Sequence, residues 1–233
     1  MARKHLLLAT FAAFTLLATA GTAFAANSVS APTSCGYSGY SYAGLIADQS
    51  ESGISADITT LAQPTITTGH VAAWIGVGGV GLGPNGSTEW LQAGISAVPG
   101  EATSLYYELA RPNATPVYRL VPLKLQTGRT YQISVQESPT RQGFWSVWVD
   151  GVQRAGGIFL PGSHDAWKPM ATSESWDGGS PACNAYTFRF SNIRSKTSGT
   201  QPWSPMTASV IDAPGYRVEG RTPLGFTAVG GAL

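Results

Sequence analysis

The sequence has few charged side chains. Only 12% of its 233 residues are Asp, Glu, Lys or Arg, against about 25% in an average globular domain. The 14 basic and 13 acidic residues give a formal net charge of +1, so there is no basic excess of the kind that binds nucleic acid or an anionic membrane surface. Because 43% of the residues are hydrophobic, the low charge does not indicate disorder.

Long apolar segments are also scarce. The longest extends from Leu6 to Ala20, after Arg3 and Lys4 and before the small-x-small sequence of residues 23–25. A charged start, an apolar run and such a site are the three parts of a secretory signal peptide, and the run is shorter than the ~20 residues that a bilayer requires. We therefore predict a signal peptide over residues 1–25, export from the cell, and no membrane partner after processing.

Cysteine and histidine are rare, with two and three residues. In an exported protein, Cys35 and Cys183 are expected to form a disulfide that ties the N-terminal segment to a late strand. A catalytic thiol is the alternative, but neither cysteine has a histidine nearby in the sequence. Beyond the signal peptide only His70 and His164 remain, so a histidine-rich metal site is not expected, and we predict no metal and no cofactor.

The 28 glycines and 15 prolines favour turns over long helices. No window of a dozen residues has convincing helical periodicity, whereas short alternating segments bounded by Gly, Pro and Asn recur, as is typical of strands. The predicted strands are Tyr42–Ala47, Gly53–Thr60, His70–Val77, Glu89–Val98, Leu105–Leu109, Val117–Leu120, Thr130–Glu137, Phe144–Asp150, Val152–Ala155, Tyr186–Asn192 and Thr207–Ile211. Asp150-Gly151 predicts a type I′ hairpin turn.

So many strands without helices predict an all-β fold, an antiparallel β-sandwich of two packed sheets. We expect a single domain over residues 26–233, with an irregular lead-in at 26–41 and extended strands at 196–233. The glycine-rich stretch 76–83 lacks the Lys-Ser/Thr pair and the helix of a phosphate loop, so we interpret it as a flexible loop.

Two segments carry candidate chemistry. In the first, alternation places Leu91, Ala93 and Ile95 on a core face, and Trp90, Gln92 and Gly94 on an open face. This open face is typical of a binding surface, although a surface Trp-Gln pair that merely covers a sheet is the alternative. In the second, Glu174 lies among aromatic residues and glycines; the alternative is an acid that simply ends an edge strand.

Other acids provide weaker candidates. Glu108 follows two tyrosines, and Asp165 follows His164. A serine-hydrolase triad would need a Gly-x-Ser-x-Gly or comparable context, which is absent. Neighbouring residues on an extended chain point in opposite directions, so His164 and Asp165 are not expected to form part of a triad.

The order of these motifs resembles the eqolisin-type glutamic peptidases. A Gly-rich loop is followed by a Trp-Leu-Gln-Ala-Gly strand, a Tyr-Tyr-Glu strand, and an acid-and-Trp segment before a Phe-rich strand. The resemblance runs from about Tyr42 to the end of the chain. It implies a concanavalin-like double sheet and an acid-active endopeptidase with a glutamine and a glutamate as catalytic pair.

Carried over by position, the resemblance implies that Gln92 and Glu174 are catalytic. It further implies that the substrate contacts are Trp74, Trp90, Glu108 and Trp176. The chain departs from the family around Glu174, where it has Ser-Glu-Ser-Trp followed by Asp-Gly-Gly instead of Ala-Glu-Trp followed by Ile-Val-Glu. The implied partner is a polypeptide substrate, and we expect the protein to be a monomer.

Three alternatives remain open at the level of sequence. A lectin-like module that binds polysaccharide could use its tryptophans as stacking platforms, namely Trp90, Trp145, Trp148, Trp167 and Trp176. A glycosidase on the same sandwich could pair Glu174 with Glu108 or Glu89. The last alternative is a peptidase homologue that has lost its activity.

Overall fold

The computed structural model describes residues 35–36, 39–177 and 183–231. The predicted signal peptide and most of the predicted lead-in lie outside these residues. Within them the fold is all-β, and its only helical segment is a short 3-10 turn, η1 (Pro84–Gly86). No described helix is long and apolar enough to cross a membrane.

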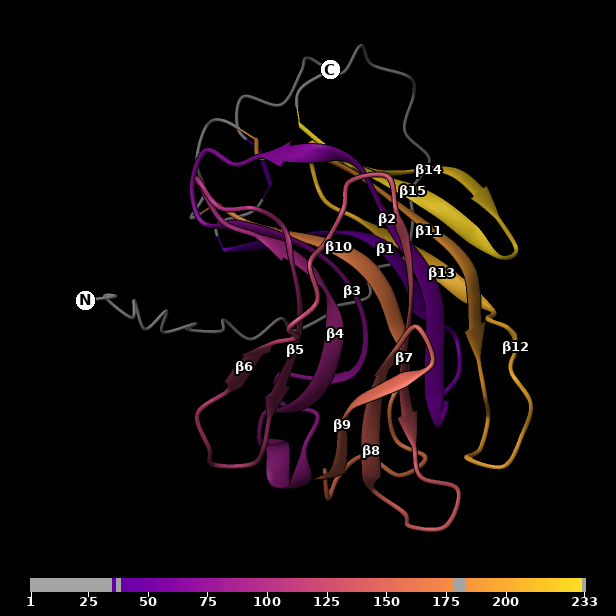
Figure 1. The fold of residues 1–233 in the computed structure, drawn as a ribbon. Coiled ribbons are helices and arrows are strands. Elements are labelled where there is room, and N and C mark those ends of the chain that lie inside the picture. The colour runs from indigo at the N-terminus through magenta and orange to yellow at the C-terminus, as the bar shows by residue number, and fades with distance from the viewer. Residues whose placement is uncertain (1–34, 37–38, 178–182, 232–233) are drawn as a thin grey trace, which may run out of the picture.

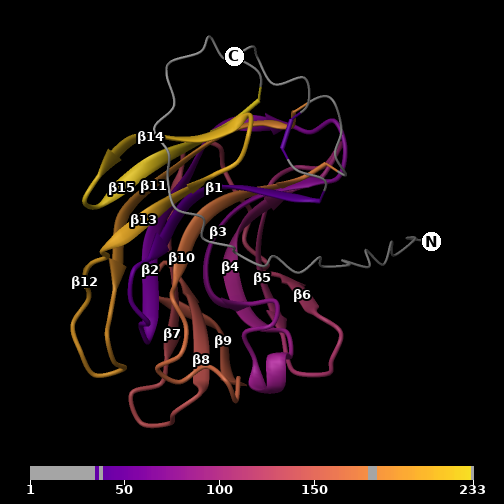
Figure 2. The same ribbon diagram turned by 180° about the vertical axis from the view of Figure 1, so that it is seen from behind.

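The strands form two large antiparallel sheets (Figures 1 and 2). They are β1 (Tyr40–Ala47), β2 (Gly53–Thr65), β3 (His70–Gly79), β4 (Glu89–Ala97), β5 (Ser104–Ala110), β6 (Val117–Leu120), β7 (Thr130–Glu137), β8 (Phe144–Val149), β9 (Val152–Phe159), β10 (Met170–Trp176), β11 (Ala185–Ser195), β12 (Ser204–Pro205), β13 (Ala208–Asp212), β14 (Tyr216–Thr222) and β15 (Gly225–Gly230). The seven-stranded sheet has the order β13-β1-β10-β3-β4-β5-β6, and the eight-stranded sheet has the order β14-β15-β11-β2-β7-β8-β9, with β12 paired to β11.

Strand alternation builds the core between the sheets. Along β4, Leu91, Ala93 and Ile95 are buried in the core, as the sequence predicted. Along β11 the buried aromatic residues alternate with more exposed polar residues, because successive side chains in a strand point to opposite faces. The predicted β-sandwich is therefore confirmed.

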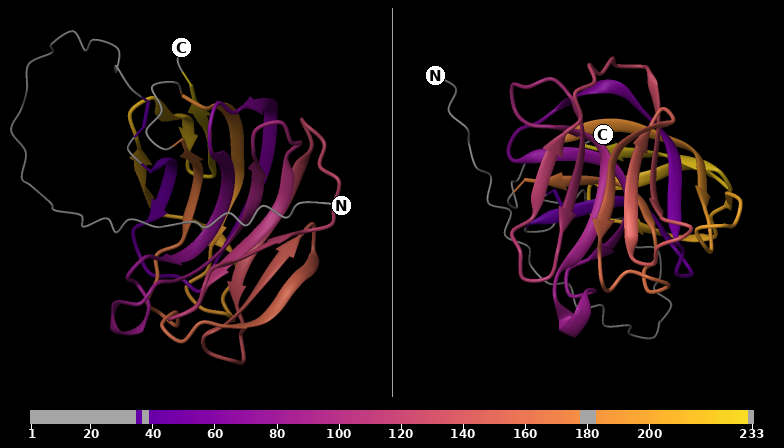
Figure 3. Two further views of the ribbon diagram at one scale, coloured as in Figure 1. Left: turned by 90° about the vertical axis from the view of Figure 1, so that its left-hand side faces the viewer. Right: turned by 60° about the horizontal axis from the view of Figure 1, so that its bottom comes forward.

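Strands that are distant in the sequence become neighbours in space. In Figure 3, indigo strands from the start of the described chain run beside orange and yellow strands from its end. In the seven-stranded sheet, β10 lies between β1 and β3. This topology places residues from the 40s, 70s, 90s, 100s and 170s in adjacent positions.

All eleven predicted strands are present; β6 and β7 have the predicted bounds, and the others have shifted ends. The type I′ turn is confirmed, because Asp150 and Gly151 have φ values of 50° and 73° and the flanking Val149 and Val152 pair. The loop prediction for residues 76–83 was wrong in its first half, since β3 continues to Gly79. The sequence analysis missed β10 and started β1 two residues late. It gave no bounds for β12, β14 and β15, which lie in the segment 196–233 where it expected extended strands.

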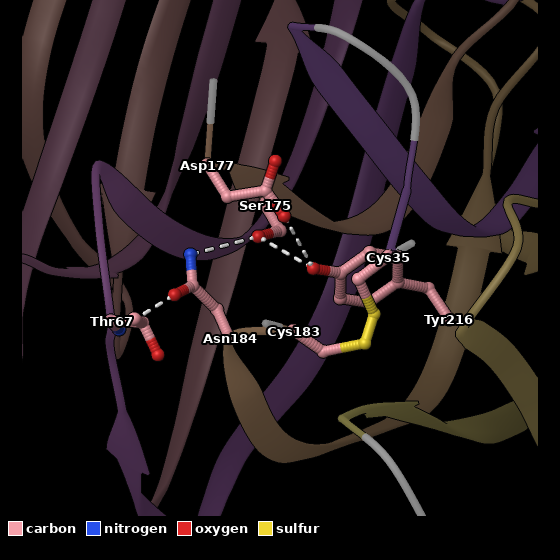
Figure 4. Close-up of a disulfide and its surroundings, with 7 residues drawn as sticks. All are labelled: Cys35, Thr67, Ser175, Asp177, Cys183, Asn184 and Tyr216. Carbon is pink, nitrogen blue, oxygen red and sulfur yellow. Dashed lines mark hydrogen bonds between the residues drawn. A yellow bond between two sulfur atoms is a disulfide. The ribbon is translucent and has the colours of Figure 1, made fainter. Parts of the chain in front are cut away.

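The predicted disulfide is present and joins Cys35 to Cys183, which are 148 residues apart, at a Cα separation of 4.9 Å (Figure 4). In the chain-entropy model, a closure of this length stabilises by about 5 kcal/mol. Gly215, with a φ of 80°, packs so closely that a Cβ there would lie 2.6 Å from the Cys35 sulfur. The bridge therefore needs glycine at this position.

Hydrogen bonds beside the disulfide anchor the end of β10. The hydroxyl of Tyr216 donates to Ser175 Oγ and Asp177 Oδ2, both at 3.1 Å. The amide of Asn184 donates to Ser175 Oγ at 3.0 Å, and its oxygen accepts from the backbone of Thr67 at 2.8 Å (Figure 4). This network fixes the strand that carries Glu174.

Candidate functional site

The outer face of the seven-stranded sheet, which points away from the core, carries the candidate site. Along β3, Val71, Ala73 and Ile75 enter the core, so Ala72, Trp74 and Gly76 lie on the outer face. Their cross-strand partners share that face. Ala72 pairs with Glu174, Trp74 with Gly94, and Gly76 with Gln92.

All six site residues suggested by the sequence lie on this outer face. Glu108 pairs with Gln92, Trp90 pairs with Gly78, and Trp176 pairs with His70. Trp176 and Trp90 therefore lie near opposite ends of β3, with Glu174, Trp74 and Gln92 between them. The topology brings the six together, while their roles remain predictions.

Both carboxylate oxygens of Glu174 are hydrogen-bonded. Oε1 lies 3.0 Å from Nε2 of His70, and Oε2 accepts a hydrogen bond from Nε1 of Trp74 at 3.1 Å. An indole N–H can only donate, so the Trp74 contact requires an acceptor on Glu174. The carboxyl is 5% exposed, which leaves it shielded by its neighbours but still at the surface.

The amide of Gln92 is held by two neighbours from β5. Its Nε2 donates to the hydroxyl of Tyr106 and to Oε2 of Glu108, both at 3.2 Å. Each amide hydrogen therefore has an acceptor. The Tyr106 oxygen receives one of these bonds, so its own O–H is left to donate elsewhere.

Two glycines make room for the central side chains. A Cβ at Gly94 would lie 2.7 Å from Cβ of Trp74, and a Cβ at Gly76 would lie 2.8 Å from Cβ of Gln92. Contacts this short do not occur between carbon atoms in real proteins, so any larger residue would displace Trp74 or Gln92. The glycines on this face thus position the candidate residues.

Burial and a concentration of acids define the electrostatics of the outer face. The pKa of Glu108 is raised to about 7, mainly by burial and also by the charge of Glu174, while His70 acts in the opposite direction. Burial also raises the pKa of Tyr42 and Tyr106 well above 10, with a contribution from Glu174. These tyrosines stay neutral, whereas Glu108 gains its proton in mild acid.

Some candidates lie elsewhere. Glu89 points to the core side of β4, and its Oε2 accepts a hydrogen bond from the backbone of Gly162 at 3.0 Å, so the structure separates it from Glu174. Trp145 and Trp167 are buried away from the outer face, and Trp90, although on that face, is only 4% exposed, so none of the three can act as a stacking platform. Trp148 lies on the eight-stranded sheet.

Two interpretations of local geometry were wrong. Glu174 does not end an edge strand, because β10 has a partner on both sides. His164 and Asp165 do not point apart: Nε2 of His164 lies 3.2 Å from Oδ2 of Asp165. Asp165 has a φ of 54°, so the chain turns here instead of running extended. Asp165 and Glu174 come from different segments, and no contact joins them among the described residues.

The sequence analysis missed His70 and Tyr106 as members of the site. A signal for His70 was available, because alternation along the predicted strand from His70 to Val77 places it on the same face as Trp74. For Tyr106 the signal was its spacing of two residues from Glu108. Among the described residues, no three His, Cys, Asp or Glu side chains form a group that could hold a metal ion.

Neither a protein-family model nor a curated protein sequence matches the chain. Solved structures of similar fold include scytalido-glutamic peptidase with a peptide-based transition-state analogue, at a TM-score of 0.60, 14% identity, and coverage of 84% of this chain and 98% of that chain. They also include SCP-B, a member of the eqolisin family, in complex with the tripeptide Ala-Ile-His, at a TM-score of 0.55, 14% identity and the same coverage. At this identity, the likeness shows a shared fold.

Proposed function

We propose that the protein is an exported, acid-active endopeptidase that hydrolyses peptide bonds with Glu174 and Gln92. The observation that carries the proposal is the placement of both residues on one face, with Trp74 in the row between them. The fold is shared with peptidases solved in complex with peptide ligands. The proposal includes cleavage of the signal peptide after Ala25 and a single domain over residues 26–233.

The chemistry needs no covalent intermediate. In this mechanism the ionised carboxylate of Glu174 takes a proton from a water molecule, which attacks the carbonyl carbon of the peptide bond. The amide of Gln92 donates a hydrogen bond to the oxyanion that forms. Glu174 then passes its proton to the departing amine, so the carboxylate is regenerated as the C–N bond breaks.

Gln92 and Glu174 are separated both across and along the sheet, and the proposal places the substrate between them. Their strands are separated by β3, which puts the strands about 10 Å apart across the sheet. Their partners on β3, Gly76 and Ala72, are four residues apart, which adds about 13 Å along the strand. No hydrogen bond joins Gln92 to Glu174 among the described residues. The row between them holds Trp74 and Gly94. Gly94 is buried, and a Cβ there would lie 2.7 Å from Cβ of Trp74, so in the proposal the peptide lies against Trp74. To receive the oxyanion, the Gln92 amide would exchange its bond to Tyr106 or Glu108 for one to substrate.

The test is digestion of an unfolded protein substrate at acidic pH. The parent protein is expected to release new peptide N-termini, while Gln92→Ala and Glu174→Gln release them far more slowly. His164→Gln is the control, because His164 lies outside the outer face. Equal digestion rates for the parent and both site variants would refute the assignment.

One observation favours a second candidate, glycoside hydrolysis. Glu108 and Glu174 share the outer face, and the pKa of Glu108 is raised to about 7, which suits a general acid beside an ionised carboxylate. The same preparation should then be incubated with soluble polysaccharides. Release of reducing ends that depends on Glu108 and Glu174, without release of peptide N-termini, would favour this candidate over the peptidase.

A further inference from the structure

His70 occupies a position from which it can control Glu174. It is the first residue of β3 and pairs with Trp176, while Glu174 pairs with Ala72 two residues further along. His70 and Glu174 are therefore diagonal neighbours on one face, within reach of long side chains. The distance of 3.0 Å between Nε2 and Oε1 is that of a hydrogen bond or an ion pair.

Aromatic rings fix the orientation of the imidazole. The ring of Trp176 stacks on His70 at a centroid separation of 6.1 Å, and the ring of Tyr40 meets it edge-on at 5.8 Å. The His70 side chain is 26% exposed, whereas that of Glu174 is only 7% exposed. His70 can thus exchange protons with solvent while it contacts a carboxylate that is nearly enclosed.

The groups around this pair are otherwise acidic or neutral. The outer face presents Tyr40 and Tyr42 from β1, Glu174 from β10, Tyr106 and Glu108 from β5, and Tyr118 from β6. Among these described residues, His70 is the one side chain that can carry a positive charge. An imidazolium next to a carboxylate favours the ionised form of that carboxylate, and its N–H aligns one oxygen while Trp74 aligns the other.

We propose that His70 is a positioning residue that holds Glu174 ionised and aligned, and that the protonation of His70 extends the activity of the site to lower pH. This proposal rests on the proposed role of Glu174 as general base. In the protonated state His70 donates Nε2–H to Oε1, and the charge it carries opposes the uptake of a proton by Glu174. Loss of this charge leaves Glu174 easier to protonate, and a protonated carboxyl cannot accept a proton from water.

The first experiment compares pH–rate profiles of His70→Gln, His70→Ala and the parent. We expect His70→Ala to lower kcat about tenfold and to move the acid limb to higher pH. His70→Gln keeps an N–H donor without a charge, so it is expected to recover most of the lost turnover but not the original acid limb. His164→Gln, which removes the histidine of another Glu pair, should leave the profile unchanged.

A second experiment follows the ring protons of His70 by NMR in the parent and in Glu174→Gln, and it does not depend on activity. Removal of the neighbouring anion is expected to lower the titration midpoint of His70, while His164 is unaffected. An unchanged midpoint would overturn the proposal.

The two experiments separate the failure of this proposal from that of the proposed function. If the parent digests protein and the His70→Gln profile matches the parent profile, the positioning role is wrong and the peptidase assignment stands. If the parent is inactive on protein, the peptidase assignment fails, and with it the role of His70 in catalysis. The NMR titration then decides only whether the two groups form an ion pair.

Discussion

Two histidine–glutamate pairs of similar geometry lie in different parts of the molecule. His70 lies 3.0 Å from Glu174 on the outer face, and His164 lies 3.0 Å from Glu137. In both pairs the carboxylate is buried and the histidine reaches the surface. Distance and burial therefore do not distinguish the pair for which we propose a role in chemistry from the pair that we interpret as structural.

The other contacts of the two carboxylates do distinguish them. Glu137 also accepts a hydrogen bond from the backbone N–H of Gly143 at 2.5 Å, and His164 also contacts Asp165. That pair joins the end of β7 to the segment after β9, which is a structural task. Glu174 is instead held by Trp74, on a face that also presents Gln92 and Glu108.

The sharpest test of this comparison exchanges each carboxylate for its amide. Glu174→Gln is expected to lower kcat/KM by about 10³ or more, because general acid–base catalysis is lost. Its contacts with His70 and Trp74 involve a buried carboxylate as well, so we also expect it to lower the free energy of unfolding by about 1–3 kcal/mol. Glu137→Gln is expected to cost about 1–3 kcal/mol, because its hydrogen bonds to His164 and Gly143 are buried, with turnover per folded molecule unchanged. Peptide hydrolysis and urea unfolding measure the two effects, and a reversed pattern would reverse the assignment.

Part of this site was predictable from local pattern. Alternation along the strand around Gln92 gave the correct face for Trp90, Gln92 and Gly94, because strand periodicity is local. The position of Glu174 was not predictable in the same way. Its strand, β10, pairs with β1 about 130 residues earlier in the chain, and such long-range pairing leaves no mark on a single sequence.

The order of the motifs along the chain predicted a link between Gln92 and Glu174 that strand periodicity could not predict. The resemblance to glutamic peptidases linked Gln92 to Glu174 across 82 positions of sequence, and both fall on the outer face. It carried no information on His70, which the structure places against Glu174. Contacts between side chains of different strands depend on register and rotamer, so they emerge only in three dimensions.

A second test contrasts glutamines on the two sheets. Gln92→Ala removes the proposed oxyanion donor, so kcat is expected to fall by about 10²–10³ while binding of substrate changes little. Gln136 lies on the eight-stranded sheet, where its Oε1 accepts a hydrogen bond from Lys196 at 2.9 Å. Gln136→Ala is the matched control and should leave kcat intact. A similar loss in both variants would indicate a general effect on folding.

A third test uses pH to measure how much Glu108 on the outer face lowers the free energy of unfolding. The pKa of Glu108 is raised from 4.5 to about 7, so between these values the folded protein binds more protons than the unfolded chain, and stability falls as the pH rises. Glu108→Gln removes this dependence and is expected to be more stable than the parent at pH 8 by up to about 3 kcal/mol. Urea unfolding of both proteins at pH 4 and pH 8 measures it. If the stability of the parent did not fall between pH 4 and pH 8, the prediction that ionised Glu108 is destabilising in the folded protein would be wrong.

The smallest expected effect concerns two tryptophans, one on the outer face and one in the core, whose indole N–H groups each donate a hydrogen bond. Trp74 Nε1 donates to Glu174 at 3.1 Å, and Trp145 Nε1 donates to Ser163 Oγ at 2.7 Å within the core. Phenylalanine keeps most of the ring and removes the donor in each case. Because Glu174 retains its contact with His70, Trp74→Phe is expected to lower kcat only about tenfold, which corresponds to about 1.4 kcal/mol, within the range for one hydrogen bond to a charged group. Trp145→Phe removes one hydrogen bond from the Ser163 hydroxyl, which keeps its bond to the carbonyl of Leu160 at 2.7 Å, so it is expected to cost about 0.5–1.5 kcal/mol of stability with normal turnover. Steady-state kinetics and urea unfolding of both variants therefore separate a donor that aligns Glu174 from a donor that contributes to the stability of the core. If Trp74→Phe lost stability without losing turnover, the outer face would have a structural role like that of the region around Glu137.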